Sequence, residues 1–255
     1  MRQNKWTREE TIVAFNVYCK IPFAKSSKSN PTVIEYAHLL GRSPSALNMK
    51  IGNIGRLDPS LRENGIVGLS HGSKMEEEVW KEFRESPENF IHESEKVIRR
   101  LAKSKGIDKV PYTETLPKGE EQERVVRVRV NQKFFREAVL SAYNNRCCIS
   151  GVGHSSLLEA CHIVDWASHP TERTNPSNGL CLSSFFHKAY DGNLLAITPD
   201  YEIILSEALL DTTSDGAFKV YLKEINGSKI SIPDKFLPDR DLLALHYEGY
   251  IKEGV

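Results

Sequence analysis

Hydrophobic residues in the first 60 positions recur at helical spacing, in segments separated by short polar breaks. Apolar positions after a capping threonine predict a helix over residues 7–21, which ends before Pro22. Two further helices are predicted over residues 30–40 and 43–51, and each begins with a capping side chain followed by a proline. Gly41 between them is typical of a helix end, so a glycine-containing turn should join the second and third helices.

Helix, turn and helix form the outline of a DNA-reading helix-turn-helix, whose second helix lies in the major groove with its N-terminal part facing the bases. In this interpretation the DNA contacts come from polar residues in and around the third helix. These candidates are Arg42, Ser45, Asn48, Lys50 and Arg56. The alternative is a plain three-helix bundle in which the same apolar residues form a core, and nothing in this stretch excludes it.

The middle of the chain predicts a boundary between two domains. Residues 73–105 form a charged helical stretch with an apolar stripe, broken at Ser86-Pro87. Residues 106–123 contain glycine, proline and glutamate without periodicity, which indicates a linker. We therefore expect a helical DNA-recognition domain with its connecting helix over residues 1–105, and a second domain over residues 124–255.

Strand-like and helical patterns alternate in this second domain. Valine and arginine alternate over residues 125–130, which predicts a strand with Arg127 and Arg129 on one face. These two arginines would either meet a phosphate or form the solvated side of an edge strand. Other predicted strands are 157–164, 194–197, 201–205, 218–222 and 230–232, and predicted helices are 132–143, 180–190 and 240–247.

Composition narrows the class of protein. The 255 residues are 40% hydrophobic and 27% charged, as in ordinary globular proteins. No apolar run approaches the roughly 18 residues of a transmembrane helix, and the first residues lack the apolar core of a signal peptide. We expect a cytoplasmic protein with no membrane partner. Its five cysteines, an odd number, indicate reduced thiols or metal ligands.

Basic and acidic residues are equal in number, 34 of each, but they are segregated along the chain. Residues 1–70 and 96–145 are net basic, whereas residues 71–95 and 146–255 are net acidic. Two basic segments suit a polyanion such as double-stranded DNA, although solvated helix faces give the same pattern. Charge alone leaves both interpretations open.

The chemistry is concentrated in four motifs that follow one another. They are Cys-Cys-Ile-Ser-Gly at 147–151, Leu-Glu-Ala-Cys-His-Ile at 158–163, Asn-Gly-Leu at 178–180 and His-Lys-Ala-Tyr-Asp at 187–191. This series resembles the ββα-metal finger of the HNH endonucleases, in particular a restriction-endonuclease-like branch, over about residues 125–200. The resemblance implies an α+β protein with an N-terminal helical, helix-turn-helix-like domain and a C-terminal ββα-metal (HNH) nuclease domain.

The resemblance assigns roles that fit phosphodiester hydrolysis. A water must lose a proton at neutral pH, and His162 occupies the general-base position of the motif. Asn178 would tie the loop that orients His162. His187 follows Asn178 at the spacing of the family's metal ligand, and Asp191 lies one helical turn further on. The alternatives are histidines satisfied within a core and an aspartate that ends a helix. His246 and Glu248 are expected at the surface.

A divalent metal ion is the implied cofactor, with Mg²⁺ expected first and Mn²⁺, Ni²⁺ or Zn²⁺ as alternatives. Many HNH enzymes carry Asp or His immediately before the general base, whereas this chain has Cys161. A thiolate is a poor ligand for Mg²⁺, so Cys161 either packs or shifts the metal preference, and we favour packing. The cysteines form no Cys-x-x-Cys pair, which disfavours a structural zinc.

These observations predict a metal-dependent DNA endonuclease of restriction type, acting on double-stranded DNA, with dependence on modified cytosine as a hypothesis by analogy. Cutting both strands with one finger per chain calls for two chains or two binding events, so a homodimer is a further hypothesis. Two alternatives stay open: a DNA-binding regulator with a non-catalytic finger, and a nonspecific or RNA-directed nuclease of toxin type. A zinc protease is disfavoured because the His-Glu-x-x-His helix is missing.

Overall fold

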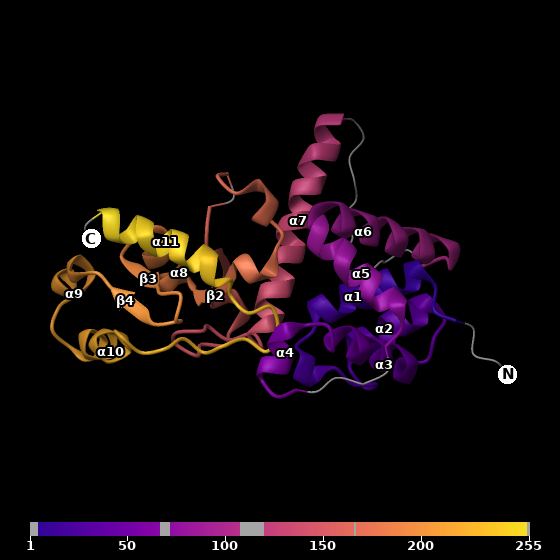
Figure 1. The fold of residues 1–255 in the computed structure, drawn as a ribbon, viewed down its shortest axis with the longest axis horizontal. Helices are drawn as coiled ribbons and strands as arrows, with labels where there is room; N and C mark the ends of the chain where they lie inside the picture. Colours follow the sequence, from indigo (N-terminus) through magenta and orange to yellow (C-terminus); the bar gives the residue numbers. More distant parts are fainter. Residues whose placement is uncertain (1–4, 67–71, 108–119, 166, 254–255) are drawn as a thin grey trace.

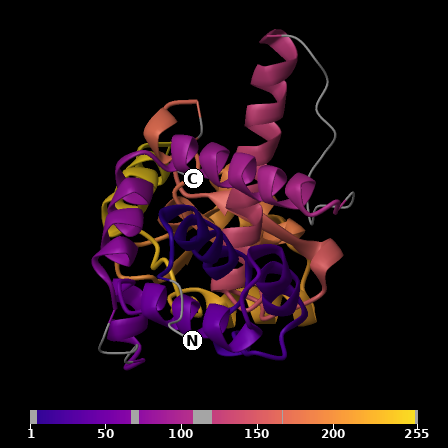
Figure 2. The ribbon, with the colours of Figure 1, turned by 90° about the vertical axis from the view of Figure 1, so that its right-hand side faces the viewer.

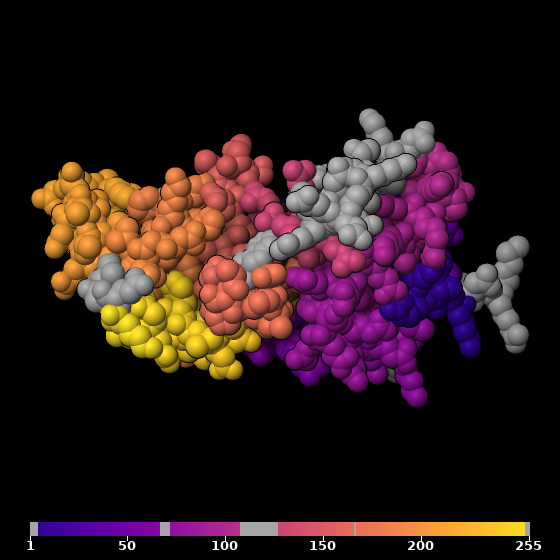
Figure 3. Space-filling model, turned by 90° about the horizontal axis from the view of Figure 1, so that it is seen from above, coloured from indigo at the N-terminus to yellow at the C-terminus, as the bar shows by residue number. Residues whose placement is uncertain are grey.

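The computed structural model describes residues 5–66, 72–107, 120–165 and 167–253, and it is elongated, with the N-terminal helices at one end and the C-terminal residues at the other (Figure 1, Figure 3). The N-terminal part is helical. Its helices are α1 (Arg8–Lys20), α2 (Pro31–Leu40), α3 (Pro44–Gly55), α4 (Pro59–Glu63), α5 (Lys74–Glu85) and α6 (Pro87–Ser104), and a short 3-10 turn, η1, covers Phe23–Lys25. The helix α7 (Glu120–Ala142) follows.

Local capping explains where the first helices begin and end. Thr7 and Glu10 form a capping box at the start of α1, since each side chain bonds the backbone of the other residue. The Asn30 side chain caps α2, and Ser43 caps α3. Gly41 ends α2 with φ of 68°, a left-handed conformation that glycine adopts without strain. The three predicted N-terminal helices and the glycine-containing turn are therefore present.

The core of the N-terminal part is built around α1. Every residue from Thr11 to Cys19 is buried, and α1 contacts α2, α3, α5, α6 and α7. The break predicted at Ser86-Pro87 separates α5 from α6, where the proline takes the first position of α6. Figure 2 shows α7 rising beside α6 and projecting beyond the rest of the molecule.

The C-terminal part contains a ββα unit. Strands β1 (Leu158–His162) and β2 (Gly179–Ser183) pair antiparallel, with His162 opposite Gly179, and helix α8 (Ser184–Asp191) follows β2 directly. A Cβ at Gly179 would lie 2.3 Å from Cγ2 of Val139, so only glycine lets β2 approach α7 this closely. The remaining elements are η2 (Ser155–Leu157), η3 (Pro170–Glu172), η4 (Pro176–Asn178), the antiparallel pair β3 (Leu195–Ile197) and β4 (Ile203–Leu205), α9 (Glu207–Thr212), α10 (Ala217–Ile225) and α11 (Arg240–Glu253).

Several predicted elements were wrong in type. Residues 125–130 are helical within α7, because helix propagates from the buried 134–142 segment more easily than an isolated strand forms. Residues 218–222 belong to helix α10, residues 180–183 belong to strand β2, and residues 230–232 form no strand. The beginning of α7 also makes residues 120–123 of the predicted linker helical, while residues 108–119 lie outside the described part.

The two halves of the chain share one core. Helix α7 contacts α1 and α6 on the helical side, and β1 and β2 on the other. Lys235, from the C-terminal part, is fully buried and donates hydrogen bonds to the carbonyl oxygens of Tyr18 at 2.6 Å and Ile21 at 2.9 Å. The division at residues 106–123 stays a prediction about the sequence. Among the described residues, no helix combines the length and the hydrophobicity that crossing a membrane requires.

Candidate metal centre and active site

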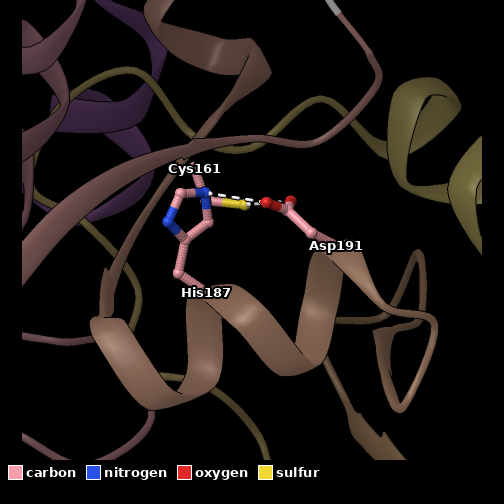
Figure 4. Close-up of side chains that lie close together, drawn as sticks. All are labelled: Cys161, His187 and Asp191. Carbon is pink, nitrogen blue, oxygen red and sulfur yellow. Dashed lines mark hydrogen bonds and ion pairs between the residues drawn. The ribbon is translucent and has the colours of Figure 1, made fainter.

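Strand β1 and helix α8 bring three potential metal ligands together. Figure 4 shows Cys161 on β1 and His187 and Asp191 on α8 with their side chains converging, and their ligand atoms all lie within 4.8 Å of one another. Nε2 of His187 is 3.3 Å from Oδ2 of Asp191, and Sγ of Cys161 is 3.8 Å from Oδ1 of Asp191. Cys161 is fully buried in the hydrophobic core, as the packing prediction requires, and its sulfur also lies beside the other two potential ligands.

Glu159 orients the histidine of this cluster. It lies two residues before Cys161 on β1, on the same face of the strand, and its Oε2 is 2.6 Å from Nδ1 of His187. The carboxylate accepts a hydrogen bond from Nδ1–H, so the proton stays on Nδ1 and the Nε2 lone pair is left for a metal ion. Hydrogen bonds from Ser184 and His187 lower the pKa of Glu159, so it is ionised at neutral pH. The sequence analysis missed this role, although the two-residue spacing on a strand was a usable signal.

His162 is held in an orientation suited to a general base. Its ring stacks on Phe135 of α7, with ring centroids 3.8 Å apart and planes 2° apart. Its Nε2 lies 3.0 Å from the carbonyl oxygen of Arg173. Because a carbonyl only accepts, Nε2 carries the proton and Nδ1 is the nitrogen that can take one from water. Burial lowers the pKa of His162 below its usual value, which keeps the ring neutral and basic at neutral pH.

Asn178 is fully buried and ties the loop between the two strands. Its Oδ1 accepts from the backbone N–H of Val164 at 3.0 Å, and its Nδ2 donates to the carbonyl oxygens of Val164 at 3.3 Å and Glu172 at 3.2 Å. The tied loop includes Arg173, whose carbonyl meets His162. Asn178 thus contacts the backbone on both sides of the loop, which is the arrangement that a positioning role requires.

His162 and two members of the ligand cluster, His187 and Asp191, line one open cleft of about 470 Å³, whereas the third member, Cys161, is fully buried and is not among the lining residues. Its lining consists of His162, Ile163, Asp165, His187, Tyr190, Asp191, Asn193 and His246. His246 from α11 is half-buried and stacks on Tyr190, with ring centroids 3.8 Å apart. The expectation that His246 is a surface residue was therefore wrong, because α11 folds back over the finger, whereas Glu248 is exposed as expected.

Two of the predicted DNA contacts are engaged inside the helical part. Lys50 is 5% exposed and forms a buried ion pair with Glu76 of α5, so its prediction as a DNA contact is corrected: the ammonium group is not available to a groove. Arg42 pairs with Glu10 at 2.8 Å, and its guanidinium lies 5.0 Å from the ring centroid of Trp6. These contacts hold the start of α3 against α1.

The other predicted DNA contacts lie nearer the surface. Arg56 pairs with Glu77 at 2.9 Å, Oδ1 of Asn48 accepts a hydrogen bond from Ser26 at 2.8 Å, and Ser45 is exposed. Arg127 and Arg129 are both exposed on α7. Because successive residues of a helix are rotated by about 100°, positions two apart face different directions, so the predicted shared face of these arginines was wrong.

A two-stranded antiparallel sheet followed at once by a helix, with convergent ligands from strand and helix and a histidine beside them, defines a ββα-metal finger. Residues 147–198 match a family model described as HNH endonuclease. The matched stretch includes Cys161, His162, Asn178, His187 and Asp191. The C-terminal half of the chain therefore contains an HNH endonuclease domain. Comparison with curated proteins gave no match.

Proposed function

We propose that this protein is a divalent-metal-dependent endonuclease that hydrolyses phosphodiester bonds of double-stranded DNA. The observation that carries the proposal is that His162, His187 and Asp191 line one cleft, within the stretch that matches the HNH endonucleases. The buried Cys161 completes a cluster of possible ligands with His187 and Asp191. A base and a cation site side by side are the two elements that hydrolysis of a phosphodiester requires.

In this mechanism Nδ1 of His162 takes a proton from the attacking water. The Arg173 carbonyl accepts a hydrogen bond from Nε2–H, which keeps the proton on Nε2 and so fixes the tautomer. The stacked Phe135 ring keeps the imidazole plane fixed during the transfer. Cys161, His187 and Asp191 would hold the cation, and their sulfur, nitrogen and oxygen donors fit a single divalent ion. A bound cation stabilises the charge that develops on the phosphate and the leaving oxygen.

The proposal extends to a restriction-type role, with products that carry 5′-phosphate and 3′-hydroxyl ends. Cleavage of both strands would use two fingers, supplied by a homodimer or by two binding events. Recognition of modified cytosine is the most specific part of the proposal. It rests on analogy with the restriction-endonuclease-like branch of the HNH family. The exposed start of α3, with Ser45, is the part of the helical region that supports a DNA-reading role.

The test of function is a cleavage assay on supercoiled plasmid, on the same DNA with modified cytosines and on RNA, with Mg²⁺, Mn²⁺, Ni²⁺, Zn²⁺ or EDTA. We expect metal-dependent cutting of DNA that EDTA abolishes and that His187→Ala reduces strongly, because this variant removes a ligand. His154→Ala is the matched control, since His154 is exposed and its Nδ1 bonds the nearby Ser156 hydroxyl, away from the ligand cluster. Binding without cutting under every metal would favour the regulator, and preferential cutting of RNA would favour the toxin-type nuclease.

The thiol of Cys161 predicts a metal preference away from Mg²⁺, because Mg²⁺ favours oxygen ligands and thiolates bind softer ions. Titration of the protein with Co²⁺ should give a sulfur-to-cobalt charge-transfer absorption that Cys161→Ser abolishes. The variant should also bind Zn²⁺ about tenfold more weakly or worse, a change of roughly 1.4 kcal/mol. Cys148→Ala, at a buried cysteine outside the ligand cluster, should keep the absorption. Retention of the band in Cys161→Ser would show that this cysteine only packs.

A further inference from the structure

We propose that a second cavity is a subsite for a backbone phosphate of DNA. Of the residues that line it, only Arg173 belongs to the stretch that matches the HNH endonucleases. This phosphate subsite lies between α6, α7 and the loop that precedes β2, and its volume is about 180 Å³. Its lining consists of Glu88, Asn89, His92, Arg127, Val128, Asn131 and Arg173. The inference rests on the proposed DNA substrate and adds a place where that substrate is held.

The chemistry of the lining favours an anion. Arg127 and Arg173 bring two permanent positive charges, whereas Glu88 is the single carboxylate among the lining residues. Asn89 and Asn131 add neutral amide donors, and guanidinium and amide groups are the side chains that commonly bind DNA phosphates. Glu88 and Asn89 belong to the first turn of α6, where the helix dipole is positive.

The subsite is connected to the catalytic histidine through α7. Arg127, Asn131 and Phe135 are spaced four residues apart, so they lie along nearly the same face of that helix. Phe135 stacks on His162, and Asn131 and Arg127 line the subsite one and two turns earlier. A DNA strand that follows this face of α7 would pass from the phosphate subsite to the general base.

Arg173 provides a second connection. Arg173 lines the subsite, and its carbonyl oxygen accepts the hydrogen bond from Nε2 of His162 at 3.0 Å. One residue would therefore bind the phosphate with its side chain and hold the general base with its backbone. Substituting the Arg173 side chain would remove the phosphate interaction but keep the carbonyl that holds His162. The phosphate interaction can therefore be tested separately from the base.

This arrangement also distinguishes the two arginines that the sequence pairs. Arg127 lines the phosphate subsite, whereas Arg129 is absent from its lining and faces another direction on α7. The helical part would then hold DNA through the start of α6 as well as through α3. Arg129 supplies a control of the same residue type, on the same helix and two positions away.

The test is equilibrium binding of a short fluorescent DNA duplex in EDTA, where no cleavage occurs, over a series of salt concentrations. For the Arg127→Gln/Arg173→Gln double variant we expect weaker binding, and a slope of log K against log salt that is shallower by about 0.9 for each phosphate that the protein no longer neutralises. Arg129→Gln should keep the slope, and Glu88→Gln should bind more tightly because the opposing carboxylate is gone. In a cleavage assay, Arg173→Gln should raise KM more than it lowers kcat.

The outcomes separate this inference from the proposed activity. A shallower slope in a protein that cuts no DNA would support the subsite and contradict the nuclease. Normal slope and affinity in the folded double variant would overturn the subsite even if the wild type cuts DNA. Failure of the wild type to bind duplex at low salt would overturn it as well. Circular dichroism and thermal unfolding check that each variant is folded.

Discussion

Replacing His162 with alanine is expected to slow DNA cleavage by a factor of about 10² to 10⁴, the contribution that a positioned general base makes. The reason is that Nδ1 of this ring is the proton acceptor in the proposed mechanism, and without it the attacking water would have no positioned base. Binding of metal and of duplex DNA should persist, because the proposed ligands are Cys161, His187 and Asp191 and the proposed phosphate subsite lies elsewhere. The measurement is single-turnover cleavage with saturating metal, alongside Co²⁺ titration.

The pH profile gives this prediction a second readout. Burial lowers the pKa of His162 below its usual 6.5, so the neutral, proton-accepting ring persists on the acid side of that value. The cleavage rate of the wild type should therefore fall only below pH 6.5, and the residual rate of His162→Ala should lack this fall. His154→Ala, at an exposed histidine of the same domain, should cut like the wild type. An unchanged rate in His162→Ala would remove the base from the mechanism.

Replacing Lys235 with methionine is expected to lower the free energy of unfolding by about 3 kcal/mol or more, because several buried acceptors lose their donor at a cost of about 1 to 3 kcal/mol each. The Lys235 ammonium donates to three carbonyl oxygens near the end of α1, those of Tyr18, Cys19 and Ile21, and to Oγ of Ser141 at 3.1 Å. Methionine fills similar space but leaves these buried acceptors without their donor. Urea unfolding at neutral pH measures the change, and Lys223→Met, at an exposed lysine, is the control.

The same lysine predicts a pH dependence of stability with a definite sign. Burial lowers the pKa of Lys235 to about 8 from its usual 10.5. Between these two values the unfolded chain binds more protons than the folded protein, so this residue makes stability rise with pH. The difference in unfolding free energy between wild type and Lys235→Met should therefore grow from pH 8 to 10.5, by about 3 kcal/mol at most. A difference that shrinks over this range would contradict the assignment.

The sequence signals for the proposed ligands and the proposed base are local, while the roles of these residues stay predictions. His187 and Asp191 are four residues apart on one helix, and Cys161 precedes His162 on one strand. The orientation of His162 could not be predicted, because the Arg173 carbonyl that holds its tautomer comes from an irregular loop with no side-chain signal. The place of His246 could not be predicted either, because this residue reaches the cleft only where α11 folds back over the finger.

Elements whose patterns fit two structures were the ones mispredicted. Alternating valine and arginine at 125–130 fits a strand, yet the helix that begins at residue 120 continues through these residues. Among the described residues, no strand pairs with this segment. Lys50 was expected at the DNA because the helix-turn-helix interpretation places it in the helix that enters the major groove. It is buried because Glu76, from a helix further along the chain, supplies the opposite charge. Such pairings depend on tertiary contacts that periodicity does not report.

Helix α7 limits how this protein could be divided into separate domains. The family match begins at residue 147, but Phe135, which stacks on His162, and Val139, which requires glycine in β2, both precede it. The boundaries of the recognised domain are thus not those of a folding unit. The finger could be transferred to another DNA-binding protein only together with α7. In that protein, α7 would also need other helices to replace the ones it packs against here.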